Sequence, residues 1–236
     1  MQKIIGIVAL VAISGSAVGQ SLITAGPSAQ GTGGYAARAT YQLDDGTAEN
    51  SVGLTGGGYI VASNQFTVAG GNNVLTSLEV TWGSPVFPGT SGVNAGDPFD
   101  IFIWADTGAG PQAGTLLYQG VGFADAGAVD NNVFQVVGLP NVVVPGAGFL
   151  IGVGKLHVGG NFPMATDLNV QLPGRSWASG GPGFDPNTAP GFAGGPALDL
   201  QAIGLGNWMI RANAVPAPGA MALVGLGGLL VARRRR

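Results

Sequence analysis

The sequence predicts an all-β protein, a single antiparallel β-sandwich of jelly-roll type, placed between an N-terminal signal helix and a C-terminal transmembrane helix. Three observations support the β-sandwich. Short apolar segments recur along the chain, and several alternate with polar residues at the period of two that a half-buried strand requires. Stretches rich in Gly, Pro, Asn and Asp separate them, and 44 of the 236 residues are glycine. No segment between residues 36 and 214 sustains the 3.6-residue period of an amphipathic helix.

The clearest expected strand covers residues 74–82, where Leu78, Val80 and Trp82 alternate with polar neighbours. Residues 99–105 (FDIFIWA) are apolar on both faces, which is typical of a central strand. Further strands are expected at residues 36–43, 58–68, 115–119, 133–137, 142–144, 149–157 and 207–215. Strands this short, separated by turns, favour a sandwich over a helical or α/β fold.

The domain organisation follows from this pattern. Residues 20–35 are small and polar and are interpreted as a flexible leader, and residues 36–214 form the β-sandwich domain. Residues 174–196 are rich in Gly and Pro, and we expect them to form one long loop. The pair Gly152 and Gly154 has no strand–loop–helix context, so it predicts no phosphate site.

Composition and charge exclude several classes of function. Only 9% of residues are charged, and between the basic ends of the chain lie four basic and twelve acidic residues, a balance of −8. We therefore expect no nucleic-acid partner, because phosphate binding needs clustered Lys and Arg. The chain has no cysteine, which excludes disulfides, thiolate zinc sites and cysteine nucleophiles.

Residues 1–19 have the layout of a signal peptide. Lys3 supplies the positive charge, residues 4–13 are unbroken apolar residues, and Ala17 and Gly19 are small residues at the −3 and −1 positions. We expect cleavage after Gly19 and export of the rest of the chain. The alternative is a retained N-terminal anchor, although the apolar run is short for a bilayer.

The C-terminal segment, residues 215–236, combines a proline motif, an apolar stretch and a basic end. Residues 219–232 are apolar and would form a helix of about 21 Å, short for a bilayer core of about 30 Å. The flanking residues are Pro216, Ala217, Pro218, Arg233, Arg234, Arg235 and Arg236. The arginines are expected to stay in the cytoplasm while the body is exported.

This layout resembles the PEP-CTERM sorting signal, in a planctomycete-like variant that reads VPAPG, an apolar helix and RRRR. Alanine at position 217 stands where glutamate is usual. The resemblance implies a processing partner of exosortase type, contact with the membrane through the C-terminal helix, and final placement in the outer envelope or outside the cell. The alternative is an ordinary tail anchor. The body resembles non-catalytic β-sandwich domains of exported bacterial proteins in its DDGTAEN, IFIWAD, GFLIGVG, GRSW and WMIRA segments.

Asp44, Asp45 and Glu49 place three carboxylates within a short turn, and they are the candidate calcium ligands because calcium prefers many oxygen ligands. The alternative is a solvated loop in which an aspartate caps a turn. No other cofactor is expected. Arg211, inside the last expected strand, should pair with a buried or edge carboxylate.

Arg175 and Trp177 are the candidate ligand-binding pair, because a tryptophan beside an arginine can stack on a sugar ring, as in an exopolysaccharide. The alternative is a loop tryptophan packed on the edge of the sandwich. Trp82, Trp104 and Trp208 fall in strand patterns and are expected in the core.

Catalytic residues are not expected. Asp97, Asp100 and Asp106 would serve glycoside hydrolysis only if two of them were held roughly 5–9.5 Å apart. His157, the single histidine, is interpreted as a surface residue at a strand end. The predicted function is an exported, non-enzymatic envelope or matrix protein with a structural or binding role. The alternatives are a secreted carbohydrate-active enzyme and a calcium-stabilised adhesion module.

Overall fold

The computed structural model describes residues 38–106, 114–188, 191–192 and 195–217. Within these residues the protein is all-β, with mostly antiparallel sheets and three short 3-10 turns at Ala126–Ala128, Pro186–Thr188 and Gln201–Ile203. The predicted signal peptide, the leader and the tail beyond Ala217 lie outside the described residues. In the described part of the chain, no helix has the length and apolar character needed to cross a membrane.

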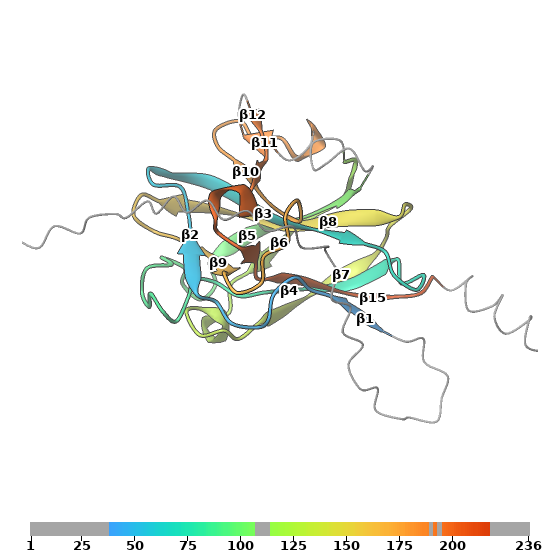
Figure 1. Cartoon of the computed structure of the whole chain (residues 1–236), viewed down its shortest axis with the longest axis horizontal. Coiled ribbons are helices and arrows are strands. Elements are labelled where there is room, and N and C mark those ends of the chain that lie inside the picture. The colour runs from blue at the N-terminus through green and yellow to red at the C-terminus, as the bar shows by residue number, and fades with distance from the viewer. Residues whose placement is uncertain (1–37, 107–113, 189–190, 193–194, 218–236) are drawn as a thin grey trace, which may run out of the picture.

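Two sheets face each other and a small third sheet closes one end (Figure 1). The four-stranded sheet has the order β1 (Ala39–Tyr41), β15 (Ile210–Val215), β4 (Val74–Val80) and β7 (Gln135–Val143). The eight-stranded sheet runs in the order β12 (Gly195–Pro196), β11 (Gly191–Phe192), β10 (Ser176–Gly180), β3 (Gly57–Thr67), β8 (Gly148–Val158), β5 (Pro98–Ala105) and β6 (Leu116–Phe123), with β13 (Leu198–Asp199) also paired to β10. The third sheet contains β14 (Asn207–Trp208), β9 (Met164–Asp167) and β2 (Asn50–Val52).

The chain crosses repeatedly between the two large sheets. If β1, β3, β4, β5, β6, β7, β8 and β15 are numbered one to eight, the sheet orders read 1-8-3-6 and 2-7-4-5. The first and last of these strands pair with each other, through Tyr41 and Ala212 among others. Among these eight strands, only the connection from β5 to β6 joins two neighbours in one sheet. Neighbouring strands are therefore mostly distant in sequence.

One apolar core fills the space between the two large sheets. Tyr41 of the four-stranded sheet contacts Phe149 and Phe66 of the eight-stranded sheet, with ring centroids 5.1 and 5.7 Å apart. The alternation of β15, buried at every second residue, has the period expected of a strand with one face on this core. Of the three tryptophans predicted in the core, Trp82 and Trp208 lie in this core, and Trp104 is fully buried in a second apolar cluster on the other face of the eight-stranded sheet. Full burial of a large apolar side chain stabilises the fold by about 1.5–3 kcal/mol.

The expected loop at residues 174–196 is wrong in its first part, where β10 forms, and in its last part, where the short strands β11 and β12 form. Residues Ser176–Gly180 form β10, which pairs antiparallel with β3 over five residues. Small residues allow this strand to lie close to its neighbour: a Cβ at Gly180 would stand 2.2 Å from the carbonyl oxygen of Tyr59. Serine, alanine and glycine carry little strand propensity, so tertiary pairing rather than local preference forms this strand.

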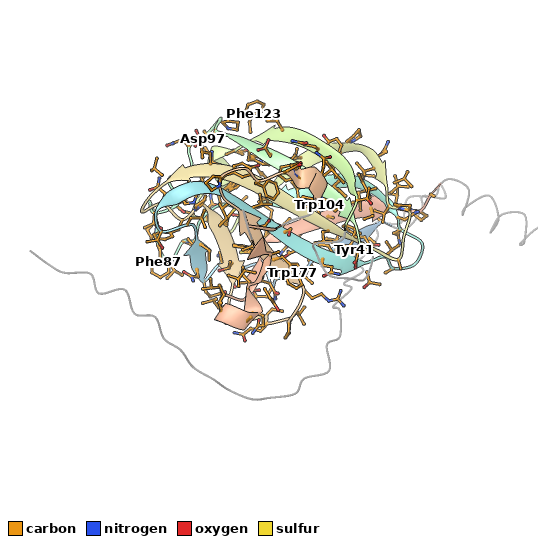
Figure 2. The ribbon with its side chains drawn as sticks, turned by 90° about the horizontal axis from the view of Figure 1, so that it is seen from above. Tyr41, Phe87, Asp97, Trp104, Phe123 and Trp177 are labelled. Atoms are coloured by element: carbon orange, nitrogen blue, oxygen red, sulfur yellow. The ribbon has the colours of Figure 1, made fainter. Side chains whose placement is uncertain are left out.

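The outer face of the eight-stranded sheet is covered in part by the chain that follows β10. Val61, Phe102, Trp104 and Leu150 form a second apolar cluster there. Phe184, from the segment after β10, packs against this cluster. Figure 2 shows Phe123 and Asp97 at one edge of the molecule and Trp177 towards the other. One face of the eight-stranded sheet therefore packs in the core, and the outer face carries the second apolar cluster.

Candidate functional site

A shallow pocket lies on the outer face of the eight-stranded sheet, between the strands and the segment after β10. Its volume is about 390 Å³, within the range of roughly 300–1,000 Å³ typical of small-ligand sites. Strands β3, β5 and β6 supply one wall and residues 181–186 supply the other. The lining residues are Tyr59, Asp100, Phe102, Gln119, Gly181, Pro182, Gly183, Phe184 and Pro186.

Gly154 of β8 makes room for the central polar contact of this pocket. Tyr59 and Asp100 stand on opposite sides of β8, since Tyr59 is opposite Leu156 and Asp100 is opposite Gly154. The Tyr59 side chain crosses over Gly154 and its hydroxyl donates a hydrogen bond to Oδ2 of Asp100. A Cβ at position 154 would stand 2.1 Å from the Tyr59 hydroxyl oxygen. Any larger residue there would displace the tyrosine.

Three aromatic rings surround this contact. Phe184 lies between the other two, with its ring centroid 5.8 Å from that of Tyr59 and 5.7 Å from that of Phe102. Phe102 stacks in turn on Trp104, at 5.3 Å. Aromatic faces beside a few polar groups are a usual composition for a small-ligand site.

The segment that carries Phe184 is tied to the sheet at both ends. The Gly181 N–H donates to the Tyr59 carbonyl at 2.7 Å, and the Trp104 indole N–H donates to the Pro186 carbonyl at 2.8 Å. The pocket wall is therefore held in place by hydrogen bonds from strands β3 and β5.

The pocket carries a single formal charge, on Asp100. The ion pairs within the described residues are Lys155 with Asp97 and Arg211 with Asp44, so no cation there neutralises Asp100. Burial, together with the hydrogen bond and negative charge of Asp100, raises the pKa of Tyr59 above its usual value. Tyr59 therefore stays protonated and remains a donor at neutral pH.

Exposed apolar side chains extend the same face beyond the pocket. Leu156 and Val158 of β8 are 71% and 68% exposed, and Val121 and Phe123 of β6 are 59% and 65% exposed. Val121 pairs with Asp100 across β5 and β6, so this apolar surface begins beside the pocket. Exposed apolar surface next to a pocket is typical of a binding face.

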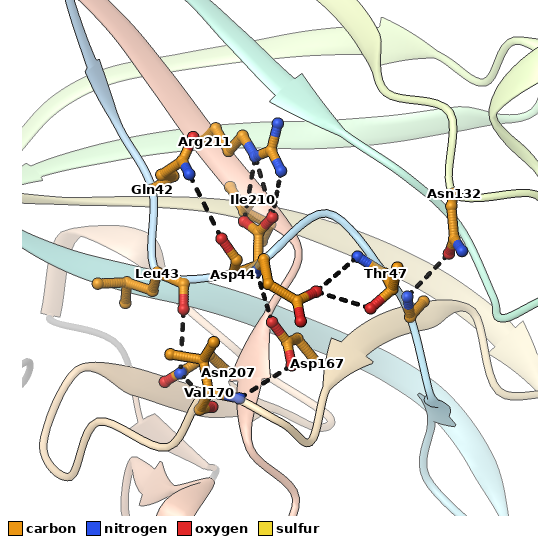
Figure 3. Close-up of polar contacts among 12 residues, drawn as sticks. Gln42, Leu43, Asp44, Thr47, Asn132, Asp167, Val170, Asn207, Ile210 and Arg211 are labelled. Atoms are coloured by element: carbon orange, nitrogen blue, oxygen red, sulfur yellow. Dashed lines mark hydrogen bonds and ion pairs between the residues drawn. The ribbon is translucent and has the colours of Figure 1, made fainter. Parts of the chain in front are cut away.

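The structure separates the three candidate calcium ligands. Asp44 is buried, and its carboxylate accepts hydrogen bonds from Nε and Nη2 of Arg211, so the predicted ion pair of Arg211 with a buried carboxylate is confirmed. Asp45 and Glu49 instead lie with Asp167 of β9, with one carboxylate oxygen from each within 4.8 Å of the others. The set of Asp44, Asp45 and Glu49 is therefore wrong in one member, because Asp44 turns to Arg211 and Asp167 takes its place (Figure 3).

The carboxylates of this acidic cluster already accept hydrogen bonds from the chain. Asp167 accepts from the N–H of Asp45 at 2.6 Å and from the N–H of Asn169 at 2.7 Å. Asp45 accepts from the hydroxyl and N–H of Thr47, which lowers its pKa, while burial raises the pKa of Asp167. The cluster thus ties the turn after β1 to the end of β9, and its three close carboxylates are also suited to a hard cation.

Trp177 and Arg175 do not form the exposed pair that the sequence predicts. Trp177 is half-buried in β10, packs on the outer apolar cluster and donates its indole N–H to the side-chain oxygen of Gln65 at 3.2 Å. The Arg175 carbonyl accepts from the Gln65 N–H at 2.7 Å. Neither residue lines the pocket. The pocket-lining residues Tyr59, Gln119 and Phe184 are not predicted from the sequence, because each is an ordinary strand or loop residue with no local motif.

Of the three aspartates considered for catalysis, Asp100 is the one that lines the pocket, and Asp97 and Asp106 lie far apart. Asp97 and Asp106 flank β5 at its two ends, about 30 Å apart in an extended strand. Asp97 binds Lys155, with Nζ 3.2 Å from Oδ2, and Asp106 accepts from the side-chain amide of Gln65 at 2.7 Å. Asp97 and Asp106 are too far apart to act as the paired acid and base of a glycosidase.

His157 is buried rather than at the surface, so that expectation is wrong. Its Nε2 accepts from the Leu54 N–H at 3.1 Å, and its Nδ1 lies 3.0 Å from the Val158 carbonyl oxygen. This pattern assigns the proton to Nδ1. The ring links the segment before β3 to the end of β8 and has a structural role.

No protein-family model and no curated protein matches this chain. Among solved structures, the chain is similar to the cysteine protease and lectin-like domains of Cwp84, a surface layer associated protein of Clostridium difficile. The identity is 13%, the TM-score is 0.45, and the match covers 76% of this chain and 36% of that one. It is also similar to the Clostridial cysteine protease Cwp84 after propeptide cleavage, at 15% identity and a TM-score of 0.49, over 76% and 40% of the two chains. The match thus spans less than half of those longer chains.

Proposed function

We propose that this protein is an exported, non-catalytic module of jelly-roll type that binds a component of the cell envelope or extracellular matrix. The binding site is the pocket on the outer face of the eight-stranded sheet, and this pocket is the observation that carries the proposal. It combines a carboxylate, a phenol, an amide and aromatic rings. These groups recognise a ligand by hydrogen bonds and ring contacts.

The jelly-roll description rests on the strand order. The orders 1-8-3-6 and 2-7-4-5 place the first strand beside the last and the second beside the seventh. Two Greek keys joined in this way are the defining feature of a jelly roll. Such a fold presents one broad sheet face, and here that face carries the pocket.

The proposal includes export and sorting through the two ends of the chain. Residues 1–19 carry the features of a signal peptide, and residues 215–236 resemble a PEP-CTERM signal read by an exosortase. In this proposal the C-terminal helix holds the protein in the inner membrane during sorting, and the domain then reaches the outer envelope or the exterior. An envelope or matrix polysaccharide is the partner that suits this location.

A carbohydrate-active enzyme is the alternative in which the same ligand would be cleaved. It would need a second carboxylate facing Asp100, and none lines the pocket within the described residues, while Asp97 is bound to Lys155. Substitution of Asp100 by Asn in an assay of glycan turnover distinguishes the two. Turnover that disappears in this variant would replace the binding proposal by the enzymatic one.

A calcium-stabilised adhesion module is favoured by one observation, the cluster of Asp45, Glu49 and Asp167. A cation that binds only the folded state raises the melting temperature with its concentration. The test is the melting temperature in millimolar calcium and in EDTA, with Asp45→Asn as the variant. Identical melting in both solutions would remove this alternative.

The proposed function is tested by binding of the exported domain to polysaccharide isolated from its own cells. Phe184→Ala removes a ring that lines the pocket and should reduce binding about tenfold or more, equivalent to about 1.4 kcal/mol. Phe87→Ala is the matched control, since Phe87 is exposed outside the pocket. Equal binding by both variants would contradict a site at this pocket.

Sorting is tested separately by the mass of the C-terminal peptide from the native envelope fraction. Loss of the chain after about residue 218 would support processing by an exosortase. A protein that ends at Arg236 in the inner membrane would instead be an ordinary tail-anchored protein.

A further inference from the structure

We infer that the pocket takes an ammonium-bearing sugar, such as a hexosamine unit of a glycan that is not N-acetylated. The inference rests on the proposed binding function and names the ligand class of the same site. Three features carry it: the charge in the pocket, the rings around that charge, and the open side of the Asp100 carboxylate.

The negative charge of Asp100 in the pocket favours a cationic ligand. Asp100 is partly buried, and it lies in a pocket whose other lining residues are all uncharged. The nearest lysine on β8, Lys155, is turned away, because its Nζ binds Asp97 at 3.2 Å and the Pro98 carbonyl at 3.2 Å. A carboxylate that is partly removed from water gains from a cationic partner. Within the described residues the protein supplies none, so the ligand is the source.

The aromatic rings beside Asp100 also favour a cationic ligand. Phe184 contacts both Tyr59 and Phe102, so the aromatic surface is continuous around the carboxylate. The face of an aromatic ring carries partial negative charge and attracts a cation within about 6 Å of its centroid. An anionic sugar, such as a uronic acid, would meet both the carboxylate and these faces and be repelled.

The geometry leaves part of the carboxylate for the ligand. Tyr59 donates to Oδ2 of Asp100, and this bond fixes the orientation of the carboxylate. Oδ1 then accepts from one N–H of an ammonium group, and the side-chain oxygen of Gln119, which lies on β6 in the pocket wall, accepts from another. The apolar C–H face of a sugar ring can pack against the wall formed by Phe184 and Pro186, which a small ammonium ion would leave uncovered.

The test compares two probes of the same length with the full exported domain: an oligomer of glucosamine and its N-acetylated counterpart. Isothermal titration should show the glucosamine oligomer binding about tenfold tighter or more, since a charge-assisted contact of about 1.4 kcal/mol corresponds to tenfold. Asp100→Asn should abolish this preference, because it keeps the shape and an acceptor for Tyr59 but removes the charge.

Asp97→Asn is the matched control. It removes the same charge about 10 Å away along β5, and it should leave the preference unchanged within about twofold. Lysine-containing peptides and polyamines of equal charge test whether any ammonium suffices, and equal affinity for them would overturn the assignment to a sugar.

Different binding results would overturn the ammonium-sugar assignment and the proposed function. Equal binding of both oligomers, or tighter binding of the acetylated one, with loss in Phe184→Ala, would overturn the ammonium assignment and keep the pocket as a glycan site. If neither oligomer binds while native polysaccharide does, and Phe184→Ala weakens that binding, the ammonium-sugar assignment is again overturned. If neither oligomer nor native polysaccharide binds, the proposed function fails together with it.

Discussion

Arg211 and Asp44, 167 residues apart in the chain, form a buried ion pair that joins the last strand to the turn after the first. Nε of Arg211 lies 3.0 Å from Oδ1 and 3.2 Å from Oδ2 of Asp44, and Nη2 donates to Oδ1. The guanidinium carbon also lies 3.8 Å from the centroid of the Phe134 ring. The pair thus fixes the closure of the sandwich, where β1 and β15 meet.

Arg211→Ala should lower the free energy of unfolding by about 3–5 kcal/mol, because it leaves the Asp44 carboxylate buried without a cation. Asp44→Asn should cost less, since the Arg211 side chain is 17% exposed and the Asp44 side chain is 0% exposed. Urea denaturation measures both. Equal costs for the two single variants would contradict the view that the buried carboxylate, and not the arginine, carries the penalty.

Gly154→Ala should disturb the pocket without disturbing the rest of the sandwich. Its Cβ would stand 2.1 Å from the Tyr59 hydroxyl and 3.0 Å from Phe102, so Tyr59 must move and lose its bond to Asp100. We expect a loss of stability of about 1–3 kcal/mol, typical of overpacking, and weaker ligand binding. The measurements are thermal melting and titration with the polysaccharide.

Gly138→Ala is the control for that experiment. Gly138 also lies in a strand, β7, but no atom lies within 4 Å of the position that an alanine methyl would take there, and its φ is not positive. Alanine at such a site restricts the unfolded chain and should leave stability unchanged or raise it by up to about 1 kcal/mol. A similar loss in both variants would mean that strand propensity, not contact with Tyr59, explains the effect.

Ionisation of Asp97 should make the stability of the domain depend on pH in the acid range. The N–H of Asn94 and the charge of Lys155 hold the pKa of Asp97 below its usual value. Its stabilising contribution is therefore present above the unfolded pKa of about 3.9 and is lost as the pH falls through the lower folded value. Because the Asp97 side chain is 33% exposed and water screens its charge, the contribution should stay below about 1 kcal/mol, although Lys155 itself is buried.

The measurement is the difference in melting temperature between the native protein and Asp97→Asn. We expect the native protein to melt about 1–3 °C higher at pH 6, and the difference to shrink at a pH well below the unfolded pKa of about 3.9. A difference that is the same at both pH values would show that the pair contributes nothing through ionisation.

The sequence predicts the fold where strands bury large side chains at a period of two. The alternation of Leu78, Val80 and Trp82 identified β4, and the apolar residues 99–105 identified β5 as an inner strand of its sheet. The sequence does not predict strand β10, in which the buried residues Ser176, Ala178 and Ser179 are small. Their position depends on β3 and on polar contacts across sheets, and neither is visible in local sequence.

The candidate site is less predictable for the same reason. Tyr59 and Asp100 are 41 residues apart and become neighbours only because β3 and β5 both pair with β8. The glycine between them, Gly154, looks uninformative in so glycine-rich a sequence. Asp167 likewise joins Asp45 across 122 residues. A carboxylate seen in sequence indicates chemistry, but the sheet order decides which carboxylates meet.

Ser176 and Ser179 test whether a buried polar network holds the sheets together. Both lie in β10 and both are fully buried. The Ser176 hydroxyl donates to Oδ1 of Asn64 at 2.7 Å, and Asn64 in turn donates to the Trp208 and Ile210 carbonyls at 2.8 and 2.9 Å. The network thus connects strands of all three sheets.

Ser176→Ala should cost about 1–3 kcal/mol, because it leaves the Asn64 side-chain oxygen buried without its donor. The Ser179 hydroxyl is buried with no hydrogen-bond partner within the described residues, so Ser179→Ala removes an unsatisfied group and should be neutral or stabilising. Urea denaturation of both variants gives the comparison. If Ser179→Ala proves as costly as Ser176→Ala, the loss reflects packing in β10, and the network is not what joins the sheets.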